Sequence, residues 1–454
     1  MNVSLIISGL KKRLGGETSV VAGTLIMQNG LRLAGSMVMT RLLTAEAFGI
    51  IGVITSVLVT FALISDIGIT AFIIRHRGAE DENFVNELWT LRLIRSIVLT
   101  VGVLAFSAPI ANFLGKPELV YAIAISSLTF VIDGLDSLGA LLALRGRKIT
   151  RLSQLDILSQ VINLGLTILL AALLRSYWAI LLGNMVSQIL RVWLSYYMFP
   201  GVRHRWRFSK VRAQEMWTFS RYITASTILT LIIRQSDKIV LAKVFSLNLF
   251  GIYIIAAGLA AVPTGIAGAY GARILLPRYG ETARNNPEAL KARYYSERIL
   301  FHLMYAAGVG VLAGCAPIAV SILYDPRYQE AAFYLQILLL GSFFAFSNAA
   351  ANDVMIVSGK SYFTLSSNVV RLAYFSTAGL AAFLYMGALG LILVVATIEM
   401  VAQVYAWVVL RKLQLFDLPR ELAIIGSGLA GLALGFLLNS VLLWGVRMVG
   451  LKIG

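Results

Sequence analysis

Charged residues, cysteine and histidine are all scarce in this sequence. Only 13% of its 454 residues are charged, whereas soluble domains contain about 25%. The single cysteine, Cys315, excludes a disulfide framework within the chain and a cysteine-based zinc site. The three histidines are widely scattered, so we expect no metal site. This composition excludes an ordinary soluble enzyme.

Hydrophobic residues are abundant instead and are distributed along the whole chain. They make up 58% of it, and the mean hydropathy is +0.81. A transmembrane helix needs about 20 mostly apolar residues. Such runs predict an all-α polytopic membrane protein with thirteen spans, within a range of 12–14. The spans are expected at 18–40, 48–74, 88–110, 119–144, 152–174, 176–199, 216–242, 248–272, 299–323, 331–357, 362–386, 388–410 and 422–446.

The positions of the basic residues explain the net charge of +17. Of the 39 lysines and arginines, 24 fall in segments predicted to lie on the same side of the membrane as the N-terminus. Another 7 fall in segments on the other side, and 8 lie within the predicted spans. Because cytoplasmic loops are enriched in basic residues, we expect a cytoplasmic N-terminus and an external C-terminus, an interfacial last segment being the alternative. The basic loop 203–207 could indicate nucleic-acid binding, but a linker beside anionic lipid accounts for it, and no nucleic-acid partner is expected.

Two short stretches, 40–50 and 242–252, resemble each other and lie 202 residues apart. Each has a basic residue, an apolar pair, a hydroxyl residue and then Phe-Gly-Ile; chance similarity is the alternative. Six spans separate them, so both halves enter the membrane in the same direction, which predicts two parallel six-helix lobes with a pseudo-twofold axis along the membrane normal. The expected parts are a cytoplasmic segment 1–16, an N-lobe 17–199, a basic linker 200–215, a C-lobe 216–410 and an extra carboxy-terminal span within 411–454.

The same stretches carry a family resemblance. Residues 40–49, followed by Ser65-Asp66-Ile67-Gly68, resemble the opening of polysaccharide-type flippases. Residues 235–243, followed by Leu249-Phe250-Gly251-Ile252-Tyr253, are similar to the start of their second lobe. Over about residues 17–410 the chain thus resembles the polysaccharide transport (oligosaccharide flippase) family of the multidrug/oligosaccharidyl-lipid/polysaccharide exporter superfamily, of the O-antigen/exopolysaccharide repeat-unit flippase type.

The resemblance implies a transporter of the bacterial inner membrane, not an enzyme, and no cofactor. Its substrate would be a polyprenyl-diphosphate-linked oligosaccharide, flipped to the outer leaflet by alternating access for O-antigen, capsule or exopolysaccharide synthesis. Implied partners are membrane lipids, a polysaccharide polymerase and glycosyltransferases, with H⁺ or Na⁺ as coupling ion. The alternatives are a multidrug-type cation-coupled exporter of the same superfamily and a membrane glycosyltransferase or polymerase, for which the loops are too short or too basic.

Basic residues inside spans are the first candidates for substrate binding, because a charge in the bilayer is costly and usually faces a cavity or a partner. Arg92, Arg95 and Arg221 lie near cytoplasmic span ends, where snorkelling explains them. Deeper groups are expected to meet the diphosphate or the sugars, since arginine binds phosphate bidentately; structural ion pairs are the alternative. The candidates are Arg32, Gln28, Arg234, Lys238, Arg371 and Arg191.

Acidic residues inside spans are candidates for ion coupling, because buried carboxylates can carry protons or ligate Na⁺. Asp133 and Asp136 are three residues apart and share one helix face. Asp237 and Glu399 complete the set. Each could equally be the partner of an arginine.

Overall fold

The computed structural model describes residues 17–76, 81–146, 148–201, 204–360 and 362–448, and all regular structure in these ranges is helical. The fold is therefore all-α, as predicted. Contacts divide the chain into two compact units, Met1–Leu231 (unit 1) and Ile232–Gly454 (unit 2). The predicted amino-terminal segment 1–16 lies outside the described residues.

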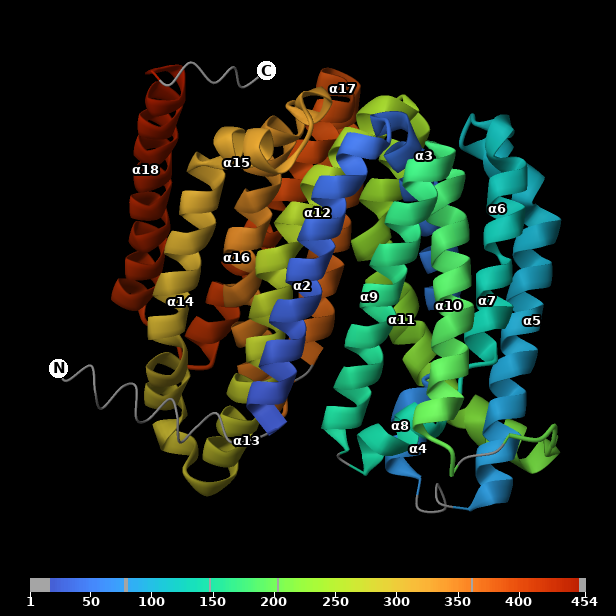
Figure 1. The fold of residues 1–454 in the computed structure, drawn as a ribbon. Coiled ribbons are helices and arrows are strands. Elements are labelled where there is room, and N and C mark those ends of the chain that lie inside the picture. Colours follow the sequence, from blue (N-terminus) through green and yellow to red (C-terminus); the bar gives the residue numbers. More distant parts are fainter. Residues whose placement is uncertain (1–16, 77–80, 147, 202–203, 361, 449–454) are drawn as a thin grey trace. The chain divides into compact units, whose positions relative to one another are not determined.

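Unit 1 contains nine complete helices in its described part and the beginning of a tenth, α11 (Figure 1). Helix α9 packs against both α10 and α2, and α5 packs against α6 and α7. The helices are α2 (Glu17–Leu42), α3 (Ala45–Ile64), α4 (Ile69–Arg75), α5 (Glu82–Phe113), α6 (Val120–Ser126), α7 (Leu128–Gly134), α8 (Gly139–Arg145), α9 (Ile149–Leu174), α10 (Trp178–Met198) and α11 (Lys210–Val244).

Two predicted spans of unit 1 are broken into shorter helices. The span expected at 48–74 ends as α3 at Ile64, and α4 begins only after Gly68, which has a left-handed φ of 65°. The Asp66 carboxylate stabilises this break by accepting a hydrogen bond from the Gly68 N–H at 2.9 Å. The span expected at 119–144 consists of α6, α7 and α8. Both breaks place polar backbone beside the cavity described below.

The division between the units falls inside α11 and not in the expected linker 200–215. The first part of this helix is held by unit 1. The Ser220 hydroxyl donates to the Ile67 carbonyl at 2.6 Å, and the Thr224 hydroxyl donates to the Asp66 carbonyl at 2.8 Å. These bonds join α11 to the α3–α4 break, whose carbonyls lack helical partners. The lobe boundaries inferred from the sequence stay a prediction.

Unit 2 continues with α12, and α16 packs against α12, α14 and α17. The long helix α17 has a non-helical residue, Gly387 (φ 60°, ψ −145°), between the two spans expected at 362–386 and 388–410. A π-helical stretch, Gly271–Leu275, joins α12 to α13. The helices are α12 (Leu247–Tyr270), α13 (Leu276–Asn285), α14 (Leu290–Gly314), α15 (Ala316–Leu323), α16 (Ala331–Val357), α17 (Tyr362–Lys412) and α18 (Leu418–Met448).

The last helix, α18, packs against α14 through glycines on both sides (Figure 1). A Cβ atom built on Gly310 would lie 2.2 Å from the Gly428 carbonyl oxygen, and one built on Gly431 would lie 2.2 Å from the Ala307 carbonyl oxygen. Such distances leave no room for any side chain. Small residues allow this close approach between membrane helices, so the extra carboxy-terminal helix is an integral part of unit 2.

Every predicted span range falls on helix. Of the helices in the described ranges, eight are long and apolar enough to cross a membrane, or nine if the bent pair α14–α15 forms one span. This confirms a multi-pass membrane protein. The set counts α17 once despite its break, and it does not include α2, α10 or α11. The full number of thirteen stays a prediction.

Candidate functional site: a polar cavity in unit 1

Unit 1 contains an open cavity of about 680 Å³ between otherwise apolar helices. Its walls come from α2, α4, α5, α7, α8, α9 and α10, together with the α3–α4 and α7–α8 breaks. Polar side chains dominate the lining: four aspartates, three arginines, five carboxamides and three serines among them. Because a polar group in hydrocarbon is costly unless it is hydrogen-bonded or wet, this concentration indicates a site for a polar ligand.

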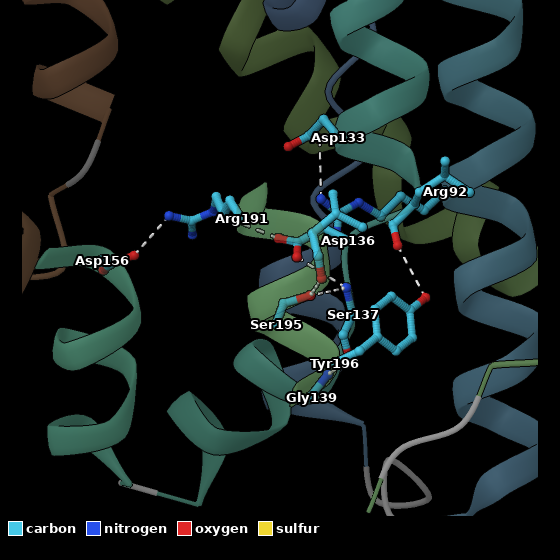
Figure 2. A network of polar contacts seen from close by, with 11 residues as sticks. Arg92, Asp133, Asp136, Ser137, Gly139, Asp156, Arg191, Ser195 and Tyr196 are labelled. Carbon is cyan, nitrogen blue, oxygen red and sulfur yellow. Dashed lines mark hydrogen bonds and ion pairs between the residues drawn. The ribbon is translucent and has the colours of Figure 1, made fainter. Parts of the chain in front are cut away.

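Two arginines of the cavity are paired with carboxylates (Figure 2). Arg92 on α5 bonds Asp133 on α7 at 3.1 Å. Arg191 on α10 bonds Asp156 on α9 at 3.1 Å and lies 3.9 Å from Asp136 on its other side. Both arginines therefore hold neighbouring helices together. Arg191 was expected to bind substrate, and the snorkelling explanation for Arg92 missed its role in this wall.

The third arginine, Arg95, closes the end of α3. Its Nε donates to the Ser65 carbonyl at 2.7 Å, and one Nη donates to the Ala62 carbonyl and the Ser65 hydroxyl, each at 2.9 Å. The last carbonyls of a helix lack intrahelical partners and carry partial negative charge, which a guanidinium satisfies. Arg95 thus fixes the break in α3 that borders the cavity.

Residues 204–207, between α10 and α11, contact helix α5 and the break between α7 and α8. His204 Nε2 accepts a hydrogen bond from the Leu138 N–H at 3.0 Å, and its ring stacks on Trp89. The Asn86 side chain accepts from the Arg205 N–H, and the Thr90 hydroxyl accepts from the Arg207 N–H, both at 2.9 Å. Burial, with the nearby Arg92 charge, lowers the pKa of His204 to about 4. The neutral ring is the form that accepts the Leu138 bond.

Five carboxamides of the lining come from three helices, and the sequence reasoning singled out only one, Gln28. Asn163 on α9 donates to Asn184 on α10 at 2.9 Å, while Gln160 and Gln188 lie along the same two helices. The spacing of these polar residues along α9 and α10 indicates that they share one face of each helix. Asp156, Gln160 and Asn163 follow one face of a helix at i, i+4 and i+7, and Asn184, Gln188 and Arg191 repeat that pattern.

The candidates of unit 2 belong to other clusters. Arg371 is 6% exposed and bonds Glu399 at 2.8 and 3.1 Å, while Asn348 donates to the same carboxylate at 2.6 Å. This is the ion pair that the sequence left open as the alternative for Arg371. Asp237 accepts from the Tyr253 hydroxyl at 2.8 Å, and its other oxygen is buried with no hydrogen-bond partner among the described residues.

Two further basic candidates take no part in the cavity of unit 1, and the side chain of a third is not among the described residues. Arg32 on α2 is exposed and is absent from the cavity lining, although Gln28, one turn earlier, is present there. Lys238 on α11 is half-buried. The side chain of Arg234 lies outside the described part of the chain.

The sequence did not predict a buried charge cluster in unit 2, because Arg298 lies in a range that was expected to be a cytoplasmic loop. Its side chain is 0% exposed and bonds Glu421 on α18. The guanidinium lies over the rings of Tyr294 and Tyr295, 4.1 and 4.8 Å from their centroids. Glu421 also accepts from the Tyr295 hydroxyl and from Trp407 Nε1, each at 3.1 Å. The cluster attaches α18 to α14.

Two solved structures share this fold. One is titled lipid II flippase MurJ, in an inward closed conformation, with a TM-score of 0.71 and 13% identity over 94% of this chain and 92% of MurJ. The other is an inward-facing multidrug resistance MATE family transporter of the MOP superfamily, with a TM-score of 0.65 and 18% identity over 87% of this chain and 97% of that one. The chain therefore shares the fold of these two proteins.

Residues 38–333 match the model of a family described as polysaccharide biosynthesis protein, and the chain belongs to this family. A curated relative is the succinoglycan biosynthesis transport protein ExoT of Rhizobium meliloti (strain 1021), which is 24% identical over 311 residues. The alignment covers 68% of this chain and 62% of the length of ExoT. These findings confirm the family resemblance read from residues 40–49 and 235–253.

Proposed function

We propose that this protein flips a polyprenyl-diphosphate-linked oligosaccharide repeat unit from the cytoplasmic to the outer leaflet of a bacterial inner membrane. The product serves synthesis of a surface polysaccharide such as O-antigen, capsule or exopolysaccharide. The observation that carries the proposal is the polar cavity of about 680 Å³ inside unit 1. A cavity of this size accommodates a ligand of several hundred daltons, and it offers hydrogen bonds that hydrocarbon lacks.

The family supports the same function. Members are named for polysaccharide biosynthesis, ExoT is named as a transport protein, and MurJ is named as a flippase of a lipid-linked substrate. A diphosphate and its sugars cross hydrocarbon only with their polar groups satisfied. Alternating access of the two units, with a cytoplasmic N-terminus, supplies such a route, and the lipid chain stays in the bilayer. A polymerase and glycosyltransferases would act after and before this step.

Coupling to H⁺ or Na⁺ is assigned to the acidic candidates. Asp133, Asp136 and Glu399 lie within about 4 Å of an arginine nitrogen. Asp237 differs, because one of its oxygens is buried and makes no hydrogen bond to the described residues. A buried oxygen in that state is best satisfied by a bound proton or cation, so Asp237 is the favoured coupling group. Arg32, Arg234 and Lys238 stay candidates for the diphosphate.

Deletion of the gene tests the function. We expect lipid-linked repeat units to accumulate in the cytoplasmic leaflet and surface polysaccharide to be lost, with both restored by the plasmid-borne gene. Leaflet position is measured by whether a membrane-impermeant glycosidase reaches the sugars in intact and in lysed spheroplasts. Continued export without any accumulated intermediate, in a strain with no second flippase gene, would show that the proposed function is wrong.

A further inference from the structure

The three arginines of the unit 1 cavity are already committed to other groups. Arg92 and Arg191 bond Asp133 and Asp156 at 3.1 Å, and Arg95 bonds the carbonyl end of α3. With Asp66, the cavity holds four carboxylates against three guanidinium groups. Its formal charge is therefore one negative. A diphosphate would meet only guanidinium groups that are already bonded to other groups, and it would be repelled by the excess carboxylate.

The glutamines of the same cavity, in contrast to its arginines, are available to bind a ligand. Gln28, Gln160 and Gln188 line it, and no hydrogen bond joins their side chains to other described residues. Each carboxamide can donate two hydrogen bonds and accept two. Ser159, which is 8% exposed and lines the cavity, also has a hydroxyl without a partner among the described residues. The available groups are therefore neutral donors and acceptors from α2, α9 and α10.

We infer that this cavity binds the oligosaccharide end of the substrate and not its diphosphate, with Gln28, Gln160 and Gln188 bonding the sugar hydroxyls. The inference rests on the proposed function and assigns one part of that substrate to one site. Neutral carboxamides and spare carboxylate oxygens match the alternating donors and acceptors of a polyol. The paired arginines are positioning residues that keep α5, α7, α9 and α10 in register around the sugar. These glutamines then determine which repeat unit is accepted.

A cysteine-protection experiment on the purified full-length protein tests the assignment. Thr70 lines the cavity and is exposed, so Thr70→Cys in a Cys315→Ser background provides a single reporter thiol. Two probes are compared: the strain's own repeat-unit oligosaccharide, freed of lipid and diphosphate, and inorganic diphosphate. We expect the oligosaccharide to slow maleimide labelling about fivefold or more, and diphosphate at equal concentration to leave the rate unchanged.

Replacement of the glutamines tests their role. Gln160→Leu with Gln188→Leu should raise the half-protecting oligosaccharide concentration about tenfold or more, because each lost bond weakens binding severalfold. Gln154→Leu is the matched control, since Gln154 is exposed on the same helix α9 and does not line the cavity. It should change nothing. The comparison of the two probes on the Thr70→Cys protein decides the assignment even if the double variant fails to fold.

Protection by diphosphate, alone or equally with the oligosaccharide, would overturn the inference, and so would a lack of protection by both. Failure of the inference is distinct from failure of the function. If Thr70→Cys cells export polysaccharide normally while the oligosaccharide gives no protection, only the sugar site is wrong. If the deletion strain accumulates no intermediate, the flippase function itself is wrong.

Discussion

Neutralising Glu421 should strongly destabilise unit 2. Glu421→Gln keeps the size of the side chain and one oxygen for Tyr295 or Trp407, but it leaves the Arg298 guanidinium buried at 0% exposure without its counter-charge. Removing one partner of a buried ion pair costs about 3–5 kcal/mol. For a unit of about 200 residues, 1 kcal/mol corresponds to roughly 2–4 °C in Tm. We therefore expect the Tm to fall by about 10 °C.

The assay measures thermal unfolding of the purified protein in detergent. Samples are heated to a series of temperatures, and size-exclusion chromatography gives the folded fraction that remains. Arg298→Met with Glu421→Leu should recover much of the loss, since replacing a buried pair by apolar groups is often neutral or stabilising. Glu215→Gln is the control, because the Glu215 side chain is 46% exposed and an exposed partner of this kind contributes about 1 kcal/mol or less. A Glu421→Gln protein with the parental Tm, or a double variant less stable than both singles, would refute the reasoning.

Three further predictions address other parts of the chain. Gly431→Leu should separate α18 from α14 and lower membrane abundance severalfold on immunoblots, while Gly426→Leu, whose Cβ has open space, should not; equal abundance would contradict the glycine contact. Arg371→Met should lower the Tm, and Arg371→Met with Glu399→Met should restore it; if export returns as well, the pair is structural only. His204 contributes stability at pH 7 that is lost as the pH falls from its ordinary pKa of 6.5 towards about 4, because the unfolded imidazole is protonated first. A His204→Ala protein should show a flatter dependence of Tm on pH over this window, and an unchanged slope would argue against the buried neutral ring.

Much of the fold follows from the sequence. Long apolar runs predict membrane helices, and Gly387 lies between two of the predicted spans. Helices occupy most of each of the thirteen expected ranges, and Gly387 separates the two halves of α17. The apolar runs alone did not predict the breaks within 48–74 and 119–144. They depend on tertiary partners such as Arg95, which satisfies the carbonyls that a broken α3 leaves open. Single-helix hydropathy contains no information about such partners.

The site was predicted only in part, for a related reason. An arginine inside a span signals a polar environment, but the sequence does not say whether that environment is a ligand or a carboxylate on another helix. Arg191 and Arg371 both meet carboxylates, 35 and 28 residues away along the chain. The cavity residues that remain available to a ligand are neutral glutamines, and selecting charged residues inside spans does not identify them. Their i, i+4 and i+7 spacing with Asp156 and Arg191 was the readable clue.

The glycine contact between α14 and α18 also sets an order of events during synthesis. Gly310 and Gly314 leave the ribosome more than 100 residues before Gly428 and Gly435, the partners against which they pack. Until α18 has been made, this groove on α14 lacks its neighbour, and Arg298 lacks the carboxylate of Glu421. Unit 2 therefore acquires these contacts only once α18 has been made. A truncated product that stops before α18 retains an unpaired buried arginine and a bare glycine groove, the features by which quality-control proteases can recognise an unfinished membrane protein.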